Sequence, residues 1–431
     1  MTTLLIRNGR ILDPASGRDD VADLLVANGK VAQIGPCLDA RADITLDATG
    51  RLVVPGFIDM HVHLREPGRE DKECIASGTR AAAAGGFTSV CPMPNTTPVC
   101  DSAQGLQFLA SRAREIASVN IFPIAAVTKG QKGEEITEYG DLVYYGAVAF
   151  SDDGHPIMNA EVMRRALEYT SMFNVPVLDH CEDLNLSEEG QMRAGAMSQK
   201  LGLKGIPAAA SSSQVARDID LADYTGGHVH ICHVADARSV DYIRTAKAKG
   251  VRVTAEATPH HLTLIDEALE GYDPNFKMSP PLGSEEDRLA VLEGLRDGTI
   301  DCIATDHAPH TDMEKDCVFA GAPNGVIGME TAFPILYTDL VLKGEISLEL
   351  LVEAMSAAPA RILNLSRGTL AVGADADIAV LDLDTEYVID PSKFFSRSRN
   401  CPFAGRTVKG CSCATIVGGK LVFRDGRFVN D

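Results

Sequence analysis

The sequence lacks the features that mark membrane, secreted and disulfide-stabilised proteins. None of its apolar runs approaches the roughly 18 residues that cross a bilayer, and its first residues, MTTLLIRNGRILDP, lack the apolar core of a signal peptide. Its 11 cysteines are odd in number and scattered, and they form no CxxC pair. We therefore predict a cytoplasmic protein without a disulfide framework, whose thiols are mostly small buried side chains.

Positive charge is also scarce. The 431 residues include 40 Lys and Arg against 60 Asp and Glu, which gives a formal net charge of -20. Such a surface repels nucleic acid and anionic membranes, so neither is an expected partner. An anionic substrate would have to be bound by a local cluster of positive charge.

No GxGxxG or Walker motif accompanies a predicted strand, which disfavours a doubly wound nucleotide-binding sheet. Instead, the middle of the chain alternates short apolar runs with helical segments. The eight runs are FIDMHVH, FTSVCPM, NIFPIAAV, GAVAFSD, VPVLDH, HVHICHV, RVTAEAT and DCIATDH. Eight strands that alternate with helices predict a parallel (β/α)8 barrel, a TIM-like fold.

The two ends of the chain differ from this middle region, because both are composed of short strand-like segments joined by turns. Their hairpin signals are the dipeptides Asn28-Gly29, Gly418-Gly419 and Asp425-Gly426. We predict that residues 1–54 plus 360–431 form a composite β-sandwich domain. Residues 55–359 would form the barrel.

Polar residues stand at the ends of six of the eight runs. They are His61, His63 and Arg65; Asn95; Asp153; His180; His233; and Asp306 with His310. Because barrel enzymes form their sites at the C-terminal ends of the strands, these side chains should converge at one mouth.

The histidines favour a metal site. His61-Val62-His63 can place two imidazoles ~7 Å apart on one face of a strand, where both reach one ion, although a hydrogen-bonded core pair is the competing interpretation. His180 and His233, taken singly, are more often core or surface histidines, but their positions after successive strands favour metal binding. Four histidines with carboxylates suit a borderline Lewis acid, and zinc is the first candidate.

Two aspartates complete the candidate site. Asp306 can ligate a metal and exchange a proton with metal-bound water, although Asp before His is more often a cap or a turn. Asp152-Asp153-Gly154 is by default a turn. A carboxylate at this position can also bridge two cations and screen their repulsion.

Seven motifs of the chain occur in the order found in a known family. They are PGFIDMHVHLREPG, MPNTTP, FSDDG, LDHCED, ICHVAD, TAEATPHHL and ATDHAPH. In these motifs the chain resembles the type I dihydroorotases of the amidohydrolase superfamily, and its terminal β-segments fit the family's small sandwich. The resemblance implies reversible cyclisation of N-carbamoyl-L-aspartate to L-dihydroorotate and water, a step of de novo pyrimidine (UMP) biosynthesis, by a zinc-bound hydroxide with an aspartate acid/base.

The resemblance also implies a role for each candidate residue, with one or two zinc ions per chain and two favoured. The more buried ion would be held by His61, His63 and Asp306, which is also the catalytic acid/base. The second would be held by His180 and His233. Asp153 would bridge the two ions, where related hydantoinases have a carbamylated lysine. The implied substrate contacts are His63, Arg65, Asn95, Ser279, His310, Asn324 and Gly325.

The chain departs from the family pattern near the substrate. Where the family usually has KxNPPLR, this sequence has KMSPPLG, with Ser279 and Gly283, and Asn324 stands where an aromatic residue is common. Serine is shorter than asparagine, so a substrate hydrogen bond worth ~1 kcal/mol is lost or bridged by water. We expect these differences to affect affinity and to leave the metal site intact.

Two other functions stay open at this point. One is a hydantoinase, dihydropyrimidinase or allantoinase, against which Asp153 and the carboxylate-binding Arg65 argue. The other is a non-catalytic dihydroorotase-like partner of aspartate transcarbamoylase, against which the full ligand set argues. Analogy also allows a homodimer, docking with aspartate transcarbamoylase, and a mobile loop at 311–325 over the site.

Overall fold

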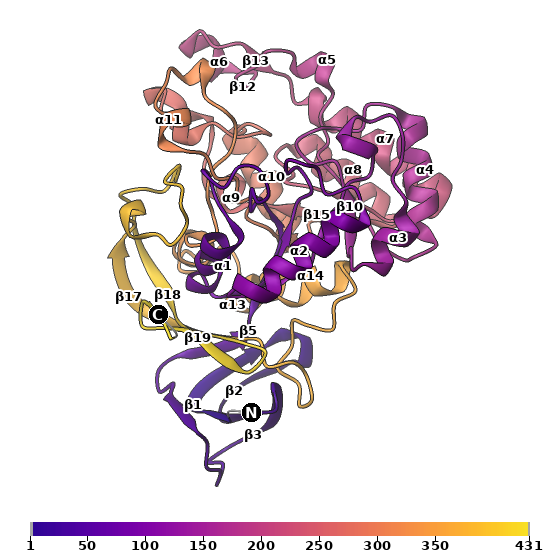
Figure 1. The fold of residues 1–431 in the computed structure, drawn as a ribbon. Helices are drawn as coiled ribbons and strands as arrows, with labels where there is room; N and C mark the ends of the chain where they lie inside the picture. Colours follow the sequence, from indigo (N-terminus) through magenta and orange to yellow (C-terminus); the bar gives the residue numbers. More distant parts are fainter. Residues whose placement is uncertain (1–2, 430–431) are drawn as a thin grey trace.

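The computed structural model describes residues 3–429, and its centre is a parallel barrel surrounded by helices (Figure 1). One parallel sheet contains β9 (Ile124–Ala125), β10 (Ala149–Ser151), β11 (Val177–Asp179), β14 (Val229–Ile231), β15 (Val253–Ala257) and β16 (Cys302–Ile303). A second contains β6 (Phe57–Val62), β7 (Phe87–Pro92) and β8 (Asn120–Ile121). All eight predicted apolar runs therefore contain strands, and the predicted (β/α)8 barrel is confirmed.

Two junctions close the barrel. A parallel bridge joins Val62 at the end of β6 to His307, just beyond β16. At the other junction, next to β7, the run NIFPIAAV forms two short strands, β8 and β9, with Pro123 between them. Pro123 has no N–H to donate, but its carbonyl still accepts from Val148 N at 3.0 Å. The two short strands therefore occupy a single strand position in the barrel.

Helices that begin at polar caps cover the barrel. The longest are α1 (Ile75–Ala84), α2 (Ala103–Ile116), α4 (Ala160–Ser171), α7 (Ala209–Thr225), α8 (Ala237–Ala248) and α10 (Glu285–Arg296). Ser102, Asp236 and Ser284 accept hydrogen bonds from the first turns of α2, α8 and α10, which fixes where those helices start. Within the described residues, no helix is both long and apolar enough to cross a bilayer.

The terminal segments meet in one nine-stranded sheet, seen at the base of the molecule in Figure 1 as indigo and yellow strands. Its strands are β1 (Leu4–Asp13), β2 (Arg18–Ala27), β3 (Lys30–Gly35), β4 (Ile44–Asp47), β5 (Leu52–Pro55), β17 (Ile378–Val388), β18 (Thr407–Val417), β19 (Lys420–Arg424) and β20 (Arg427–Phe428). β5 pairs antiparallel with β17 and so joins the two ends of the chain.

The three predicted hairpin dipeptides all lie in turns of this sheet, with both residues of each at positive φ, as type I′ turns require. The strands bury their own apolar core, in which Ile6, Leu24 and Ile378 are fully covered. The boundary predicted after residue 359 falls inside α14 (Ala357–Ile362), and the domain limits stay a prediction.

The interior of the barrel is packed with apolar and sulfur-containing side chains, among them Met60, Cys91, Leu178, Cys232 and Cys302. All 11 cysteines are free thiols and six of them are buried, as predicted. The polar residues that end the strands gather above this layer, at the C-terminal ends of the strands.

Candidate active site

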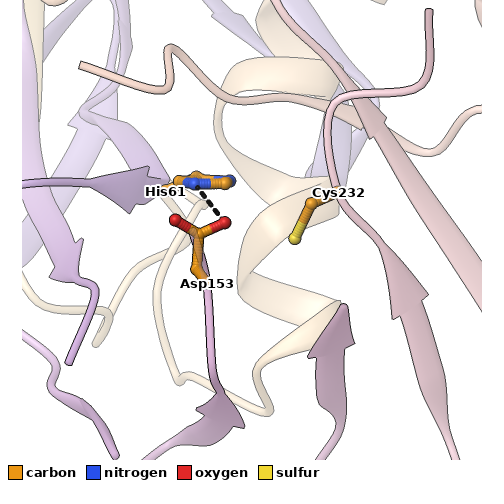
Figure 2. Close-up of side chains that lie close together, drawn as sticks. All are labelled: His61, Asp153 and Cys232. Atoms are coloured by element: carbon orange, nitrogen blue, oxygen red, sulfur yellow. Dashed lines mark ion pairs between the residues drawn. The ribbon is translucent and has the colours of Figure 1, made fainter. Parts of the chain in front are cut away.

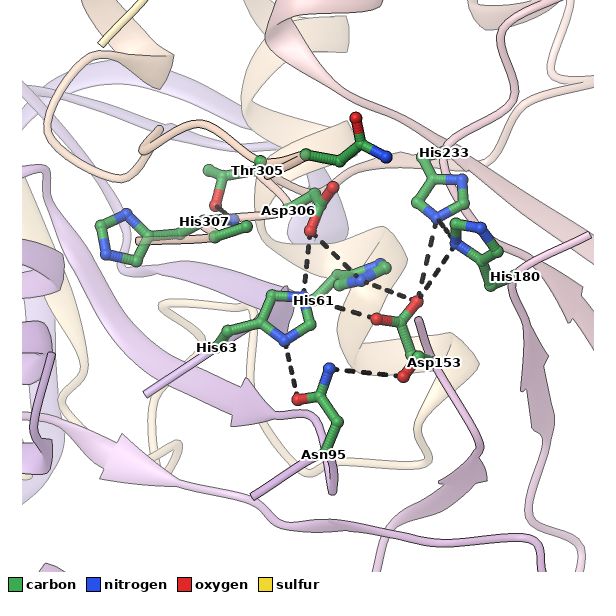
Figure 3. Close-up of polar contacts among 12 residues, drawn as sticks. His61, His63, Asn95, Asp153, His180, His233, Thr305, Asp306 and His307 are labelled. Atoms are coloured by element: carbon green, nitrogen blue, oxygen red, sulfur yellow. Dashed lines mark hydrogen bonds and ion pairs between the residues drawn. The ribbon is translucent and has the colours of Figure 1, made fainter. Parts of the chain in front are cut away.

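The six predicted metal ligands lie together at the C-terminal end of the barrel (Figure 3). They lie at the ends of five strands of the barrel wall, and all six are buried. They are His61 and His63 at the end of β6, Asp153 after β10, His180 after β11, His233 after β14 and Asp306 after β16. The expected convergence at one mouth is thus present in the structure.

His61, His63 and Asp306 form what we call the inner group. Their ligand atoms lie within 4.8 Å of one another. Asp306 Oδ1 is 3.1 Å from His63 Nε2 and 3.5 Å from His61 Nε2. Three side chains from the first and last strands of the barrel therefore face one point.

His180 and His233 form the outer group, and Asp153 lies between the two groups. His180 Nδ1 is 2.9 Å from His233 Nε2. Asp153 Oδ1 is 3.3 Å from His61 Nε2 and 3.7 Å from His180 Nδ1, so one oxygen faces both groups. The predicted turn at Asp152-Asp153-Gly154 also exists, and it is the turn that aims Asp153 inward.

The donor set fits one or two divalent cations. Among the described residues, His61 Nε2 and Asp153 Oδ1 are buried without a hydrogen-bond partner. Buried polar atoms are rarely left in this state, because the loss of water costs free energy that a partner must offset. Imidazole nitrogens and carboxylate oxygens at this spacing are ligands that zinc and similar metals prefer.

The electrostatics keep the two aspartates ionised. Burial disfavours the charged form of Asp306, but the positive charge of His61 and a hydrogen bond with His63 hold its pKa below the usual range. Burial likewise opposes charge on Asp153, and His61 and His233 hold its pKa well below the usual range. A divalent cation would act in the same direction. Both carboxylates are therefore in the form that binds metal.

Beside the cluster lies a cavity of about 270 Å³. Its walls include all the predicted substrate contacts, namely His63, Arg65, Asn95, Ser279, His310, Asn324 and Gly325. Arg65, half-buried and at a φ of 59°, donates from Nε to the carbonyl of Pro309 at 3.2 Å. The guanidinium is the group best suited to bind a carboxylate here.

His310 lines this cavity with an uncharged imidazole. Its Nδ1 accepts from Lys72 Nζ at 3.2 Å, and its Nε2 donates to the carbonyl of Asn324 at 2.7 Å. Burial, together with the positive charges of Arg65 and Lys72, lowers the pKa of His310 to about 3. Arg65 and Lys72 supply the local positive charge that the acidic surface makes necessary for an anionic substrate.

The comparisons with known proteins agree with this geometry. Residues 50–239 match the family profile described as "Dihydro-orotase-like", and residues 206–423 match "Amidohydrolase family". A curated relative named dihydroorotase, from Pelotomaculum thermopropionicum, is 54% identical over 422 residues, which cover 98% of this chain and 99% of the relative. Another, from Pelobacter propionicus, is 51% identical with the same coverage.

The chain belongs to the dihydroorotase family. Solved structures with the same fold include L-hydantoinase (dihydropyrimidinase) from Arthrobacter aurescens, at a TM-score of 0.91 and 27% identity, covering 100% of this chain and 98% of that one. Dihydropyrimidinase from Brevibacillus agri follows at a TM-score of 0.87 and 26% identity, with 99% and 96% covered. The barrel with its terminal sheet is thus the architecture of cyclic-amide amidohydrolases.

Sequence reasoning missed the polar side chains that lie against the candidate ligands of this dihydroorotase-family site. Glu256 Oε1 is 2.6 Å from His61 Nδ1, and Glu182 Oε2 is 3.1 Å from His180 Nε2. Asn95, predicted only as a substrate contact, also accepts from His63 Nδ1 at 3.0 Å. A signal for Glu256 was present, because it is a charged residue inside the apolar run RVTAEAT.

Cys232 was also missed, and it forms part of the floor of the site (Figure 2). Its sulfur lies within 4.8 Å of ligand atoms of His61 and Asp153. Burial raises the pKa of this thiol well above the usual range, so the uncharged form predominates. We therefore assign Cys232 to the packed barrel interior and do not count it among the ligands.

The loop at 311–325 lies against the cavity and is tied to the neighbouring segment 274–277. Lys315 Nζ donates to the carbonyls of Pro274 at 2.9 Å and Lys277 at 3.3 Å. Gly325 N donates to the carbonyl of Lys277 at 3.0 Å, and its φ of 129° requires glycine. Mobility of this loop stays a prediction, and any opening would have to break these bonds.

Proposed function

We propose that this chain is a zinc-dependent dihydroorotase of the cytoplasm, which interconverts N-carbamoyl-L-aspartate with L-dihydroorotate and water. The observation that supports this most is one cavity lined by Arg65 and by five of the six ligand side chains, the sixth, His61, being fully buried. A cation site is what amide hydrolysis uses to activate water, and Arg65 is what a carboxylate on the substrate would bind. We infer two ions per chain, because Asp153 faces both ligand groups.

Bound zinc would supply a Lewis acid that polarises the amide carbonyl and makes water available as hydroxide near neutral pH. In hydrolysis, Asp306 takes the proton of the attacking water and delivers it to the ring nitrogen as the C–N bond breaks. In cyclisation, Asp306 takes the proton from the ureido nitrogen as that nitrogen attacks the side-chain carboxylate, and returns it to the departing carboxylate oxygen, which takes up a second proton from solvent and leaves as water. Arg65, with His310 and Asn95 nearby, holds the other carboxylate and fixes the orientation of the ring.

A hydantoinase or dihydropyrimidinase is the second candidate, because the solved structures cited above carry those names at TM-scores of 0.91 and 0.87. Asp153 argues against it, because hydantoinases have a carbamylated lysine at the bridging position that Asp153 occupies in this chain. Arg65 argues against it as well, because uncharged rings such as dihydrouracil and hydantoin offer no carboxylate to the guanidinium. A non-catalytic role is disfavoured by the complete set of buried ligands.

The test is a turnover comparison with metal content measured on the same sample. We expect cyclisation of N-carbamoyl-L-aspartate and hydrolysis of dihydroorotate to exceed hydrolysis of dihydrouracil, hydantoin and allantoin by orders of magnitude, with one to two zinc ions per chain. Faster turnover of an uncharged ring would favour the hydantoinase alternative. A metal-replete sample inactive on every substrate would favour a non-catalytic role.

By analogy with the family, we also propose a homodimer and docking with aspartate transcarbamoylase. Size-exclusion chromatography with light scattering, alone and with added aspartate transcarbamoylase, tests both. A monomer that elutes independently of the added enzyme would contradict these two proposals and leave the catalytic one unchanged.

A further inference from the structure

A chain of hydrogen bonds runs through the barrel beneath His61. His61 Nδ1 lies 2.6 Å from Glu256 Oε1, and His230 Nε2 lies 3.2 Å from Glu256 Oε2. His230 Nδ1 is 2.9 Å from Thr254 Oγ1, which in turn is 2.8 Å from His228 Nε2. The side chains of His61, His230 and Glu256 are fully buried. None of these contacts has a role in the mechanism proposed above.

The geometry of this chain places a proton on each ring nitrogen that faces Glu256. The two Glu256 oxygens lie against His61 Nδ1 and His230 Nε2, and Oε1 also accepts from the backbone N–H of His233 at 3.3 Å. A carboxylate surrounded by such donors only accepts, so His61 Nδ1 and His230 Nε2 each carry a proton. The hydroxyl of Thr254 lies within hydrogen-bond distance of both His230 Nδ1 and His228 Nε2 and so links the two histidines.

This arrangement determines which atom of His61 faces the ligand cluster. With a proton held on Nδ1, Nε2 is the ring atom that faces Asp153 at 3.3 Å and Asp306 at 3.5 Å. The opposite neutral tautomer would aim a proton at the cation and could not bind it. The chain thus fixes the ring so that Nε2 is the nitrogen that gives up its proton when a cation binds.

We propose that Glu256 is a positioning residue that, held by His230 and Thr254, fixes the tautomer and ring orientation of His61 and so sets the metal affinity of the inner group. The inference rests on the proposed metal-dependent function. It also gives a role to His228 and His230, two histidines of the run HVHICHV that are not predicted to bind metal.

Thr254 offers a matched pair of variants for the test. Its side chain is half-buried, and its hydroxyl bonds to His228 and His230, neither of which is a candidate ligand. Thr254→Val keeps the shape but removes the hydroxyl, whereas Thr254→Ser keeps the hydroxyl. Zinc affinity is measured by competition with a chromophoric chelator at fixed pH, on protein stripped of metal and then titrated. Glu256→Gln, which removes the charge at nearly constant shape, provides the stronger perturbation.

We expect Glu256→Gln to weaken the inner zinc by about 10- to 100-fold, the usual cost of losing an outer-shell partner of a ligand histidine. Thr254→Val should weaken it by roughly 3- to 10-fold, and Thr254→Ser should bind within about 2-fold of the unmodified chain, because the hydroxyl that orients His230 is restored. Thermal unfolding of the metal-free proteins shows whether each variant folds. If Glu256→Gln does not fold, the Thr254 pair decides.

The outcomes separate this inference from the proposed function. Equal zinc affinity in Thr254→Val, Thr254→Ser and the unmodified chain would overturn the inference while the metal-dependent function stands. An equal loss in both Thr254 variants would also overturn it, because the hydroxyl would then be irrelevant. An unmodified chain that binds no zinc would overturn the proposed function, and this inference with it.

Discussion

The inner and outer groups of the metal cluster each contain two histidines but are connected to the protein in different ways. On the inner side, His61 is oriented by Glu256, whose side chain is 0% exposed and belongs to a hydrogen-bonded chain through the barrel. On the outer side, His180 is oriented by Glu182, whose side chain is 18% exposed and lines the substrate cavity.

This difference teaches that the two cation positions should not be equivalent. A carboxylate in the dry interior interacts strongly with its partner histidine, whereas one at the cavity wall is screened by water. The inner position is therefore expected to hold its ion more tightly. The outer position borders the cavity, where the substrate carbonyl must approach.

The largest expected effect is on the inner group, at the proposed proton carrier. Asp306→Asn should lower turnover by about 10³-fold or more, since it removes both a ligand and the acid/base. Cyclisation of N-carbamoyl-L-aspartate is the measurement, with thermal unfolding as the check that the fold persists. Near-normal rates would mean that the proton travels by another route and that the inner group has no special chemical role.

A substitution at Arg65 tests whether the cavity wall selects the substrate independently of the two metal groups. Arg65→Lys should raise KM by roughly 10- to 100-fold with a small change in kcat, because a charged two-point contact worth ~1.5–3 kcal/mol is lost. Arg69→Lys, at an exposed arginine on the same loop, is the matched control. Equal KM values for the two variants would remove Arg65 from carboxylate binding.

The neutral histidine in the cavity wall predicts a pH effect on stability. The pKa of His310 is about 3 in the folded chain against an ordinary 6.5, so its contribution is present above pH 6.5 and is lost as pH falls toward 3. Between pH 7.5 and 5, metal-free protein should therefore lose about 2 kcal/mol more stability than His310→Gln. Urea unfolding measures this, with the exposed His155→Gln as control. Parallel losses in all three proteins would show that His310 does not titrate in this way.

The unequal affinity of the two cation positions can be tested directly by graded chelation. We expect one ion per chain to leave at a lower chelator concentration than the other. Glu182→Gln should lower the chelator concentration needed for the first release by about 10-fold and leave that for the second release unchanged. Metal content after each chelator step is the readout. Release of both ions in a single step would contradict the proposed difference between the groups.

The smallest expected effect concerns Ser279, which stands where the family usually has asparagine. Ser279→Asn should lower KM by about 5-fold, because one hydrogen bond worth ~1 kcal/mol is restored to the substrate. Gly283 is best left unchanged in this test, since a Cβ there would meet the Asp287 side chain at 2.7 Å and 2.8 Å. A KM that rises would indicate that the cavity is already adapted to serine.

The fold could be predicted because its signals are local. Each strand of the barrel is a short apolar run between helical segments, and each terminal hairpin carries a dipeptide suited to positive φ. One predicted strand is divided into β8 and β9 at Pro123, and local sequence patterns did not predict this division. Proline in a predicted central strand marks an interruption, but the pairing that survives around it depends on neighbours far along the chain.

The candidate ligands could be predicted because a strand end exposes its polar residues in a known direction. The partners of those ligands could not, since they come from other strands. Glu256 is 195 residues from His61 in sequence, and Asn95 is 32 residues from His63. The pattern of apolar and polar residues within one segment cannot predict contacts between segments so far apart in the sequence.

By itself, the sequence determined the barrel, the terminal sheet and the types of atom available for a metal, because these follow from local patterns of apolar, turn and polar residues. Only the tertiary structure decided which nitrogen of each histidine faces the cluster and which carboxylate holds it there. The physical reason is that a histidine's tautomer is set by the hydrogen bond on its far side, and that partner is brought into place only when the barrel closes.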